Sequence, residues 1–248
     1  MAGATVVIPA RFGSTRFPAK ILASDTGKPL VQHVVDQVRR SKLVREVIVA
    51  TDDERIVAAL KPFGTRCLMT DPNHPSGTDR IAEVAQRLSD GIIVNVQGDE
   101  PEIEPKTVDG LIALLMQTET VGMATAATPF IPPADPRDPN LVKVVMDCNG
   151  RAMYFSRSPI PFHRDAADGH PPTYYLHLGI YAYARPFLLR MAGWKPTPAE
   201  LAERLEQLRA LEHREEIFVL KVNRATHGID TPEQYQAFVR RYREQAKS

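Results

Sequence analysis

Residues 6–20 read VVIPARFGSTRFPAK, a short apolar run that opens into a loop of small side chains and three cations. A parallel sheet places such a loop at the carboxyl end of a strand, where backbone N–H groups and basic side chains can face an anion. We therefore expect the cations Arg11, Arg16 and Lys20 to hold a triphosphate. The alternative reading is a basic surface loop after an edge strand. Neither GxGxxG nor GxxxxGK[ST] occurs, so the sequence gives no motif evidence for a Rossmann dinucleotide site or a Walker P-loop.

Strand-like and helix-like segments alternate from this loop onward. Short apolar strands are expected at 5–9, 46–50, 66–69 and 92–96, with helices at 30–40, 54–63 and 78–88. Repeated units of this kind predict an α/β fold with a mostly parallel central sheet and helices on both faces. Ligands of such sheets bind at the carboxyl ends of the strands.

Prolines interrupt the alternation between residues 129 and about 175, where regular helix or central strand is disfavoured. We expect an inserted β-hairpin there, with strands at 142–147 and 151–155 joined through Asn149-Gly150. The remaining expected elements are a strand at 177–184, a helix at 198–213, a strand at 217–222 and a helix from Thr231. The whole chain, 1–248, is expected to form a single domain with the hairpin and Pro-rich loops as an insertion.

Composition narrows the class of protein. Of 248 residues, 43% are hydrophobic and 25% are charged, which is typical of a soluble globular protein. The 31 basic and 30 acidic side chains leave a net charge of +1, so we expect no nucleic-acid partner and no membrane partner. Cys67 and Cys148 lack a CxxC partner and are expected to be buried free thiols. With no apolar leader or spanning run, the expected location is the cytoplasm.

Two acidic residues follow different strands of the expected sheet. Asp99, in QGDEP, comes directly after the strand at 92–96, and Asp230 follows the strand at 217–222. Both can reach the same sheet edge and form a clamp for Mg²⁺, which takes one or two carboxylates plus substrate oxygens. The alternatives are a helix N-cap near residue 105 for Asp99 and a cap-adjacent residue beside Thr231-Pro232 for Asp230.

Other polar clusters are ambiguous when taken singly. The segment 76–80, SGTDR, can bind a base or a phosphate through hydroxyl and backbone N–H groups at a helix start, or it can simply cap the helix. The segment 51–54, TDDE, reads as a helix start with favourable charges rather than as a catalytic acid pair. In the second half, YFSR at 154–157, HLGIY at 177–181 and Glu206-Gln207 acquire functional meaning only together.

Taken together, these segments resemble the 3-deoxy-manno-octulosonate (Kdo) cytidylyltransferase family over essentially the whole chain. The resemblance rests on nine strings in family order: IPARFGSTRFPAK, ATDDERI, HPSGTDRIAEV, VNVQGDEP, LVKVV, YFSRSPIP, HLGIYAY, LEQLRALE and GIDTPEQY. Each string is weak alone, but nine in register are specific.

The resemblance implies a nucleotide-diphospho-sugar transferase-like α/β fold and the formation of CMP-Kdo and pyrophosphate from CTP and Kdo, which activates Kdo for lipopolysaccharide synthesis. It also implies a requirement for Mg²⁺. The sugar's anomeric hydroxyl attacks the α-phosphorus in line, so no protein nucleophile is needed. A homodimer is expected from the resemblance and from the hairpin at 142–155, whose edge would otherwise stay exposed.

Site roles follow from the resemblance by position. The residues implied to bind the nucleotide are Ala10, Arg11, Ser14, Ser76, Gly77, Thr78 and Arg80. The residues implied in catalysis are Arg16, Lys20, Asp99 and Asp230, the two acids also binding the metal. The residues implied to contact or position the sugar acid are Gln97, Arg157, His177, Tyr181, Glu206 and Gln207.

The sequence departs from the family pattern at three positions. Ala19 stands where the family often has Gly, Gln234 replaces a frequent acid, and Leu176 replaces a basic residue before HLGIY. Leu176 removes a cation near the expected sugar pocket, which leaves 8-amino-Kdo as an alternative substrate.

Three other activities compete with this reading. One is a cytidylyltransferase for another sugar acid, such as a sialic acid, although YFSR and HLGIY favour Kdo. Another is a metal-dependent glycosyltransferase, which usually carries Asp-x-Asp, whereas Asp99 precedes Glu100-Pro101 here. A non-catalytic nucleotide-binding regulator would be expected to lack Lys20 or one of the two metal carboxylates.

Overall fold

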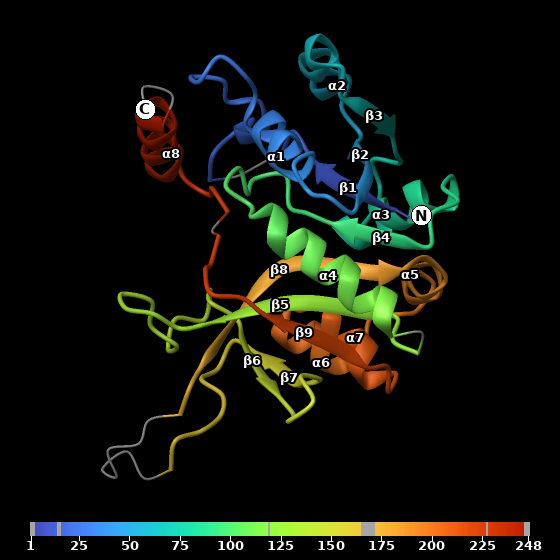
Figure 1. Ribbon diagram of the computed structural model, residues 1–248, viewed down its shortest axis with the longest axis vertical. Coiled ribbons are helices and arrows are strands. Elements are labelled where there is room, and N and C mark those ends of the chain that lie inside the picture. The colour runs from blue at the N-terminus through green and yellow to red at the C-terminus, as the bar shows by residue number, and fades with distance from the viewer. Residues whose placement is uncertain (1–2, 14–15, 119, 165–171, 227, 246–248) are drawn as a thin grey trace. The chain divides into compact units, whose positions relative to one another are not determined.

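A computed structural model describes residues 3–13, 16–118, 120–164, 172–226 and 228–245. The chain divides into two compact units, which Figure 1 shows in chain colours. Unit 1 comprises Met1–Asp109 and Thr226–Ser248, and unit 2 comprises Gly110–Ala225. The single-domain prediction stays a prediction, because compact units within a chain need not be separate domains.

Unit 1 is built on parallel strands, as the alternating pattern predicts. These are β1 (Ala4–Ala10), β2 (Val44–Thr51), β3 (Arg66–Met69) and β4 (Ile92–Asn95), in the spatial order β3-β2-β1-β4. The register places Val7 between Ile48 and Asn95. Val7 and Ile48 are fully buried, because both faces of the sheet are covered.

The helices of unit 1 follow their strands. The elements are η1 (Lys20–Leu22), α1 (Leu30–Val38), α2 (Glu54–Leu60), η2 (Lys61–Phe63), α3 (Gly77–Gln86) and α8 (Pro232–Gln245). Right-handed crossovers place α1 and α2 on one face of the sheet and α3 on the other, since the strand order reverses after β3. Helix α4 (Pro105–Gln117) begins in unit 1 and continues in unit 2.

The C-terminal segment packs onto the N-terminal part of unit 1. Ile229, Tyr235 and Phe238 form a buried cluster with Leu30 of α1, and Phe17 packs against it from the cationic loop. The rings of Phe17 and Tyr235 lie 5.6 Å apart between centroids. Residues more than 200 positions apart in sequence are therefore held together by apolar burial.

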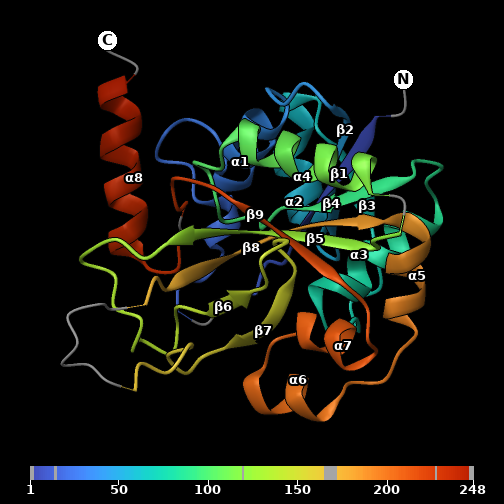
Figure 2. The same cartoon turned by 60° about the horizontal axis from the view of Figure 1, so that its bottom comes forward.

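Unit 2 has a mixed sheet, seen from a second side in Figure 2. Strand β5 (Met123–Pro129) pairs antiparallel with β8 (Tyr175–Ala184) and parallel with β9 (Ile217–Lys221). The expected hairpin is confirmed: β6 (Lys143–Met146) and β7 (Ala152–Ser156) are antiparallel, and β6 also pairs with β8. Gly150, in the turn, has a φ of 79°, which Gly adopts without strain.

The sequence prediction for unit 2 omits two elements and joins two helices into one. Strand β5 was not expected, because its ATAAT core lacks the bulky β-branched residues that mark a strand. Helix α5 (Arg185–Ala192) was also missed. The helix expected at 198–213 is two helices, α6 (Pro198–Glu203) and α7 (Gln207–Glu212), because Arg204 takes a left-handed conformation with a φ of 55° and ends α6.

The cysteines and the hydropathy give two further outcomes. Both thiols are free, but Cys148 is exposed and Cys67 is only partly buried, so the prediction of burial is wrong for Cys148. Cys148 lies in the hairpin turn next to Asn149-Gly150, and turn residues face solvent. Across the described ranges, every helix is too short or too polar to cross a bilayer.

Ala19 provides a test of local strain. Its φ of 54° lies in the left-handed region, where a Cβ costs about 1 kcal/mol and Gly costs nothing. Ala19→Gly should therefore raise the free energy of unfolding by up to about 1 kcal/mol in chemical denaturation. Ala23→Gly is the matched control, because Ala23 has a φ of −56° and should lose stability. A loss of stability in both variants would contradict strain at Ala19.

Candidate active site

The ammonium group of Lys20 lies between the two acids that sequence analysis placed at the sheet edge. Its Nζ donates to Asp99 Oδ2 at 2.6 Å, to Asp230 Oδ1 at 3.0 Å and to the Ile229 carbonyl oxygen at 2.9 Å. The other oxygen of Asp230 lies 3.1 Å from the Arg16 guanidinium. The structure thus brings the four predicted catalytic side chains together within unit 1.

Two glycines allow the acidic segments to come close. A Cβ on Gly98 would lie 3.1 Å from the Pro9 carbonyl oxygen, so the chain leaving β4 passes directly against the end of β1. A Cβ on Gly228 would lie 3.3 Å from Asp99 Oδ1. The Ile229 N–H also donates to the Asp99 carbonyl oxygen at 2.9 Å. Close backbone approach therefore fixes the spacing of the two carboxylates.

The start of α8 orients Asp230. Thr231 Oγ1 accepts from the Gln234 N–H at 3.3 Å, and Gln234 Oε1 accepts from the Thr231 N–H at 3.1 Å. This reciprocal pair is a capping box, which Gln completes as well as an acid would. Gln234 Oε1 also accepts from the Asp230 N–H at 2.6 Å. Asp230 is therefore both adjacent to a cap, as one reading held, and part of the charged cluster.

The alternative role of Asp99 as a helix N-cap is wrong. Helix α4 begins at Pro105, too far along the chain for Asp99 to cap it, and the Asp99 carboxylate faces Lys20 instead. Burial opposes the charged form of Lys20, but Asp99 and Asp230 outweigh burial and raise the pKa of its ammonium group. Lys20 is therefore a cation throughout the neutral range.

The donor set at this site fits a hard cation. The two carboxylates share the Lys20 ammonium group, Asp230 also faces Arg16, and their side chains are 24% and 41% exposed, which leaves oxygen atoms open to solvent. The described part of the chain contains no cluster of three or more His, Cys, Asp or Glu side chains that could hold a metal ion. A cation here would take its remaining ligands from substrate or water, the arrangement typical of Mg²⁺.

The predicted nucleotide-binding residues lie around the ends of β1 and the start of α3. Ala10 is the buried last residue of β1, Ser76 caps α3 by accepting from the Asp79 N–H, and Thr78 is buried in its first turn. Gly77 lies near the Pro9 ring. Arg11 is exposed and donates to the His74 carbonyl oxygen at 2.8 Å. Ser14 lies outside the described residues.

Arg80 is oriented inward. Its side chain is fully buried, donates to Asp52 Oδ2 at 2.9 Å and bonds Thr70 Oγ1, while its Nε has no partner among the residues the structure describes. Asp52 is thereby committed to Arg80, and Asp53 caps α2 by accepting from the Arg55 N–H at 2.9 Å. The reading of segment 51–54 as a helix start rather than an acid pair is confirmed.

The residues predicted for the sugar acid, apart from Gln97 after β4, lie within unit 2. Tyr181 donates to Gln207 Oε1 at 3.2 Å, and the rings of His177 and Tyr181 lie 5.5 Å apart. Gln207 is buried, and its Nε2 has no hydrogen-bond partner in the described ranges. Buried amide N–H groups are nearly always hydrogen-bonded, so the Gln207 Nε2 group is a candidate donor to a ligand oxygen. Glu206 precedes it at the start of α7.

Arg157 has most of its donors occupied by the chain itself. Its Nε donates to the Glu203 carbonyl oxygen at 2.7 Å and its Nη1 to the Pro139 carbonyl oxygen at 2.9 Å. This is the anchoring role expected of a structural arginine. Leu176 is buried in β8 beside Lys143 of β6, so this departure from the family pattern presents an apolar side chain to the interior.

Sequence reasoning assigned no role to three charged residues beside these sites, of which Glu100 and Lys143 are buried and Glu203 is partly buried. Glu100 follows Asp99, and burial, with the nearby charge of Asp99, raises its pKa to about 8, although a hydrogen bond from Thr226 opposes the shift. Lys143 and Glu203 surround Arg157. Only the LVKVV string gave a signal for Lys143, and nothing distinguished Glu203 from a surface acid.

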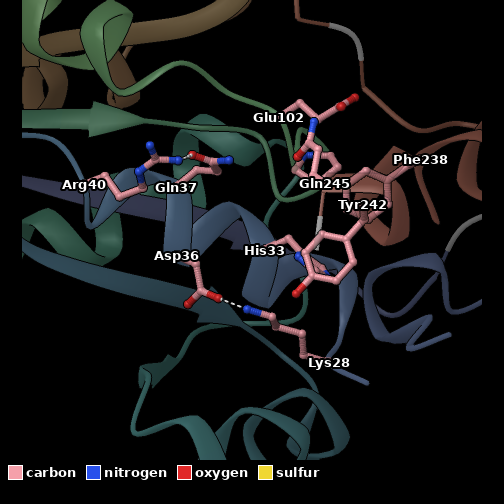
Figure 3. A pocket seen from close by; sticks show the side chains of 10 residues that line it. Lys28, His33, Asp36, Gln37, Arg40, Glu102, Phe238, Tyr242 and Gln245 are labelled. Carbon is pink, nitrogen blue, oxygen red and sulfur yellow. Dashed lines mark hydrogen bonds and ion pairs between the residues drawn. The ribbon is translucent and has the colours of Figure 1, made fainter. Parts of the chain in front are cut away.

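A cavity of about 250 Å³ lies between α1 and α8 in unit 1, and none of the predicted site residues is among those that line it (Figure 3). Its aromatic wall is formed by His33, Phe238 and Tyr242, with ring centroids 5.0 and 4.7 Å from that of His33. Of the charges that line it, Lys28 pairs with Asp36 and Glu102 with Arg241 of α8, while Arg40 donates to the Gln37 side-chain oxygen at 2.9 Å. We read it as a hollow of helix packing.

The fold and the charged cluster define a class of nucleotide-binding transferase, and similarity to known proteins makes the class specific. The sequence pattern of a family described as Cytidylyltransferase matches residues 5–217. The chain is 39% identical to a solved structure described as CMP:2-keto-3-deoxy-manno-octonic acid synthetase complexed with CTP, with a TM-score of 0.92 and coverage of 98% of this chain and 99% of that one. A cytidylyltransferase from Leptospira borgpetersenii, 19% identical with a TM-score of 0.64, shares the fold.

Curated relatives narrow the class. The 3-deoxy-manno-octulosonate cytidylyltransferase of Geobacter sulfurreducens is 51% identical over 92% of this chain and 94% of its own length. That of Leptospira biflexa is 46% identical over 96% of this chain and 95% of its own. The chain belongs to the 3-deoxy-manno-octulosonate cytidylyltransferase family.

His177 should stay neutral in the folded protein. Burial lowers its pKa to about 3, and its Nε2 lies 3.0 Å from Thr125 Oγ1. The unfolded chain takes up this proton near pH 6.5, so folding stability is lost as pH falls from 6.5 towards 3, by at most about 1.4 kcal/mol per pH unit. We expect NMR to show no titration of the His177 ring between pH 5 and 8, and His177→Asn to flatten the acid dependence of unfolding. A ring midpoint between pH 6 and 7 would contradict this assignment.

Proposed function

We propose that the protein transfers the cytidylyl group of CTP to Kdo, which yields CMP-Kdo and pyrophosphate and activates Kdo for lipopolysaccharide synthesis. The observation that carries the proposal is the cluster of Lys20, Arg16, Asp99 and Asp230 at the carboxyl ends of β1 and β4. Support also comes from relatives of that name, which match this chain over nearly their full length.

The reaction is an in-line displacement at phosphorus. The anomeric hydroxyl oxygen of the sugar acid bonds to the α-phosphorus of CTP, the bond from that phosphorus to the β-bridging oxygen breaks, and pyrophosphate leaves while the hydroxyl proton is released. Lys20 and Arg16 stabilise the charge that grows on the departing pyrophosphate. Because Lys20 is 12% exposed and the Gly98 backbone approaches closely, its charge acts in a partly dehydrated site.

We propose Mg²⁺ as the cofactor, held by Asp99 and Asp230 together with substrate oxygens. When bound, it neutralises α-phosphate charge and helps to acidify the attacking hydroxyl. Lys20 bridges both carboxylates when no metal ion is bound to them, and Arg16 pairs with Asp230. Once the two carboxylates hold Mg²⁺, Lys20 is free to turn towards phosphate.

Residues of unit 2 supply the sugar-acid site. Tyr181 fixes Gln207 Oε1, which leaves the buried Nε2 of Gln207 to donate to a substrate oxygen. The His177 ring lies between those of Phe155 and Tyr181, with centroid distances of 5.0 and 5.5 Å, and so supports Tyr181. The alternative substrate is 8-amino-Kdo, favoured by Leu176, which removes a cation that would repel an ammonium group.

Location and assembly complete the proposal. The free thiols of Cys67 and Cys148 fit a reducing cytoplasm. A homodimer is supported by exposed apolar side chains on β7 and the Pro-rich loops: Met153 is 64% exposed, Ile131 60% and Phe162 84%. Strand β7 pairs with β6, and the chain just before β7 is bridged to β9 through Arg151 and Phe218. The rest of its second edge pairs with no described strand and can take a second chain.

Pyrophosphate release from CTP and a panel of sugar acids tests the reaction. Asp99→Asn and Asp230→Asn should each lower turnover with Kdo by about two orders of magnitude or more while the fold is kept, because each removes a charge that acts in phosphoryl transfer. Asp135→Asn is the matched control, since that carboxylate is exposed and, among the described residues, is paired with Arg137 alone. Near-normal Mg²⁺-dependent rates in either site variant would refute the carboxylate clamp.

The assembly is tested by light scattering at micromolar concentration. We expect a mass of twice the 27.6 kDa chain. Met153→Asp should shift the mass towards the monomer, because a charge on an apolar contact must be desolvated. Leu201→Asp, on α6 and 52% exposed, is the control. A wild-type mass near 27.6 kDa would refute the dimer.

A further inference from the structure

Lys143 is a cation buried without a carboxylate partner among its described hydrogen bonds. Its side chain is fully buried in β6, and its Nζ donates to the carbonyl oxygens of Asp138 at 3.0 Å, Leu141 at 2.7 Å and Arg157 at 2.5 Å. An ammonium group has three protons, so every donor of Lys143 is used. The three acceptors belong to two separate segments, the Pro-rich loop before β6 and the chain after β7.

This arrangement is costly, and packing alone does not require it. Burying an ammonium group costs free energy that an apolar side chain of the same length would avoid. Burial also lowers the pKa of Lys143. A lysine at this position therefore stabilises a specific backbone geometry rather than the core in general.

Glu203 and Arg157 continue the same connection. Glu203, at the end of α6, accepts from the Arg157 N–H at 2.9 Å and from the Ser156 hydroxyl at 2.6 Å. The Arg157 guanidinium donates in return to the carbonyl oxygens of Glu203 and Pro139. Three segments, 138–141, 156–157 and 203–204, are thus joined by one lysine, one arginine and one glutamate, which we call the loop clamp.

The loop clamp adjoins the residues assigned to the sugar acid. Glu206 and Gln207 follow the turn at Arg204, whose left-handed backbone starts α7 in a new direction. The position of the buried Gln207 amide therefore depends on where segment 203–204 is held. The Lys20 cluster lies in unit 1, where the described partners of its ammonium group are Asp99, Ile229 and Asp230.

We propose that Lys143 is a positioning residue for sugar-acid recognition, acting through the Arg157 and Leu141 carbonyl oxygens and, by way of Glu203, on the start of α7. The proposal rests on the proposed function of this site. It predicts a selective effect: loss of Lys143 impairs use of the sugar acid and leaves CTP recognition nearly intact.

The test is Lys143→Met, which keeps the length of the side chain and removes the ammonium group. We expect the KM for Kdo to rise at least tenfold and the KM for CTP to stay within twofold of wild type. Arg137→Met is the matched control in the same loop, since Arg137 is exposed and its ion-pair partner within the described part of the chain is Asp135 alone. Should Lys143→Met not fold, Glu203→Gln weakens the same clamp from the other side and is expected to show the same selectivity.

Hydrogen exchange separates this proposal from the proposed function. In Lys143→Met without substrate, amides of 138–141 and 203–207 should exchange at least tenfold faster, with unit 1 unchanged. If wild type releases no pyrophosphate with Kdo but the exchange result holds, the proposed function fails while the clamp stands. Unchanged exchange with unchanged KM values would overturn the proposal, as would an equal rise of both KM values with a general loss of stability.

Discussion

The ion pairs of Lys20 with Asp99 and Asp230 are the interaction on which the rest of unit 1 depends. One ammonium group joins the loop after β1, the loop after β4 and the segment before α8. Apolar packing of Ile229, Tyr235 and Phe238 on α1 brings these segments together, and the small residues Gly98 and Gly228 let them approach. The same charges are those that a triphosphate and its counter-ion would meet, so folding and chemistry use one set of groups.

Unit 2 is organised by a different kind of interaction. Its polar centre is the loop clamp of the buried Lys143 and the partly buried Arg157 and Glu203, whose charges bind backbone carbonyl and N–H groups rather than each other. Such contacts fix the path of loops that lack regular secondary structure. Helices α6 and α7 are held differently, by a buried ion pair between the side chains of Glu200 and Arg209, with a hydrogen bond of 2.8 Å.

The sequence predicted unit 1 better than unit 2, for physical reasons. Continuous apolar runs such as VVI mark a strand buried on both faces, so the position of Asp99 directly after β4 follows from the sequence. Asp230 follows β9 of unit 2 in the chain, but it meets Asp99 because the start of α8 packs on α1, which strand spacing does not show. The bridging position of Lys20 and the inward turn of Arg80 depend on side-chain packing that spacing cannot show. Strand β5 was missed because alanines carry little strand preference, and the break at Arg204 because nothing in LAERLEQL marks a left-handed residue.

The most direct test of the central claim is a crystal structure of the protein with CTP and Mn²⁺. The anomalous signal of manganese locates the cation, and the electron density shows the position of Lys20. We predict a manganese peak bound by the carboxylates of Asp99 and Asp230, with Lys20 Nζ moved from between them onto a phosphate oxygen. A peak bound elsewhere, or Lys20 still bridging both carboxylates beside a bound triphosphate, would contradict the account.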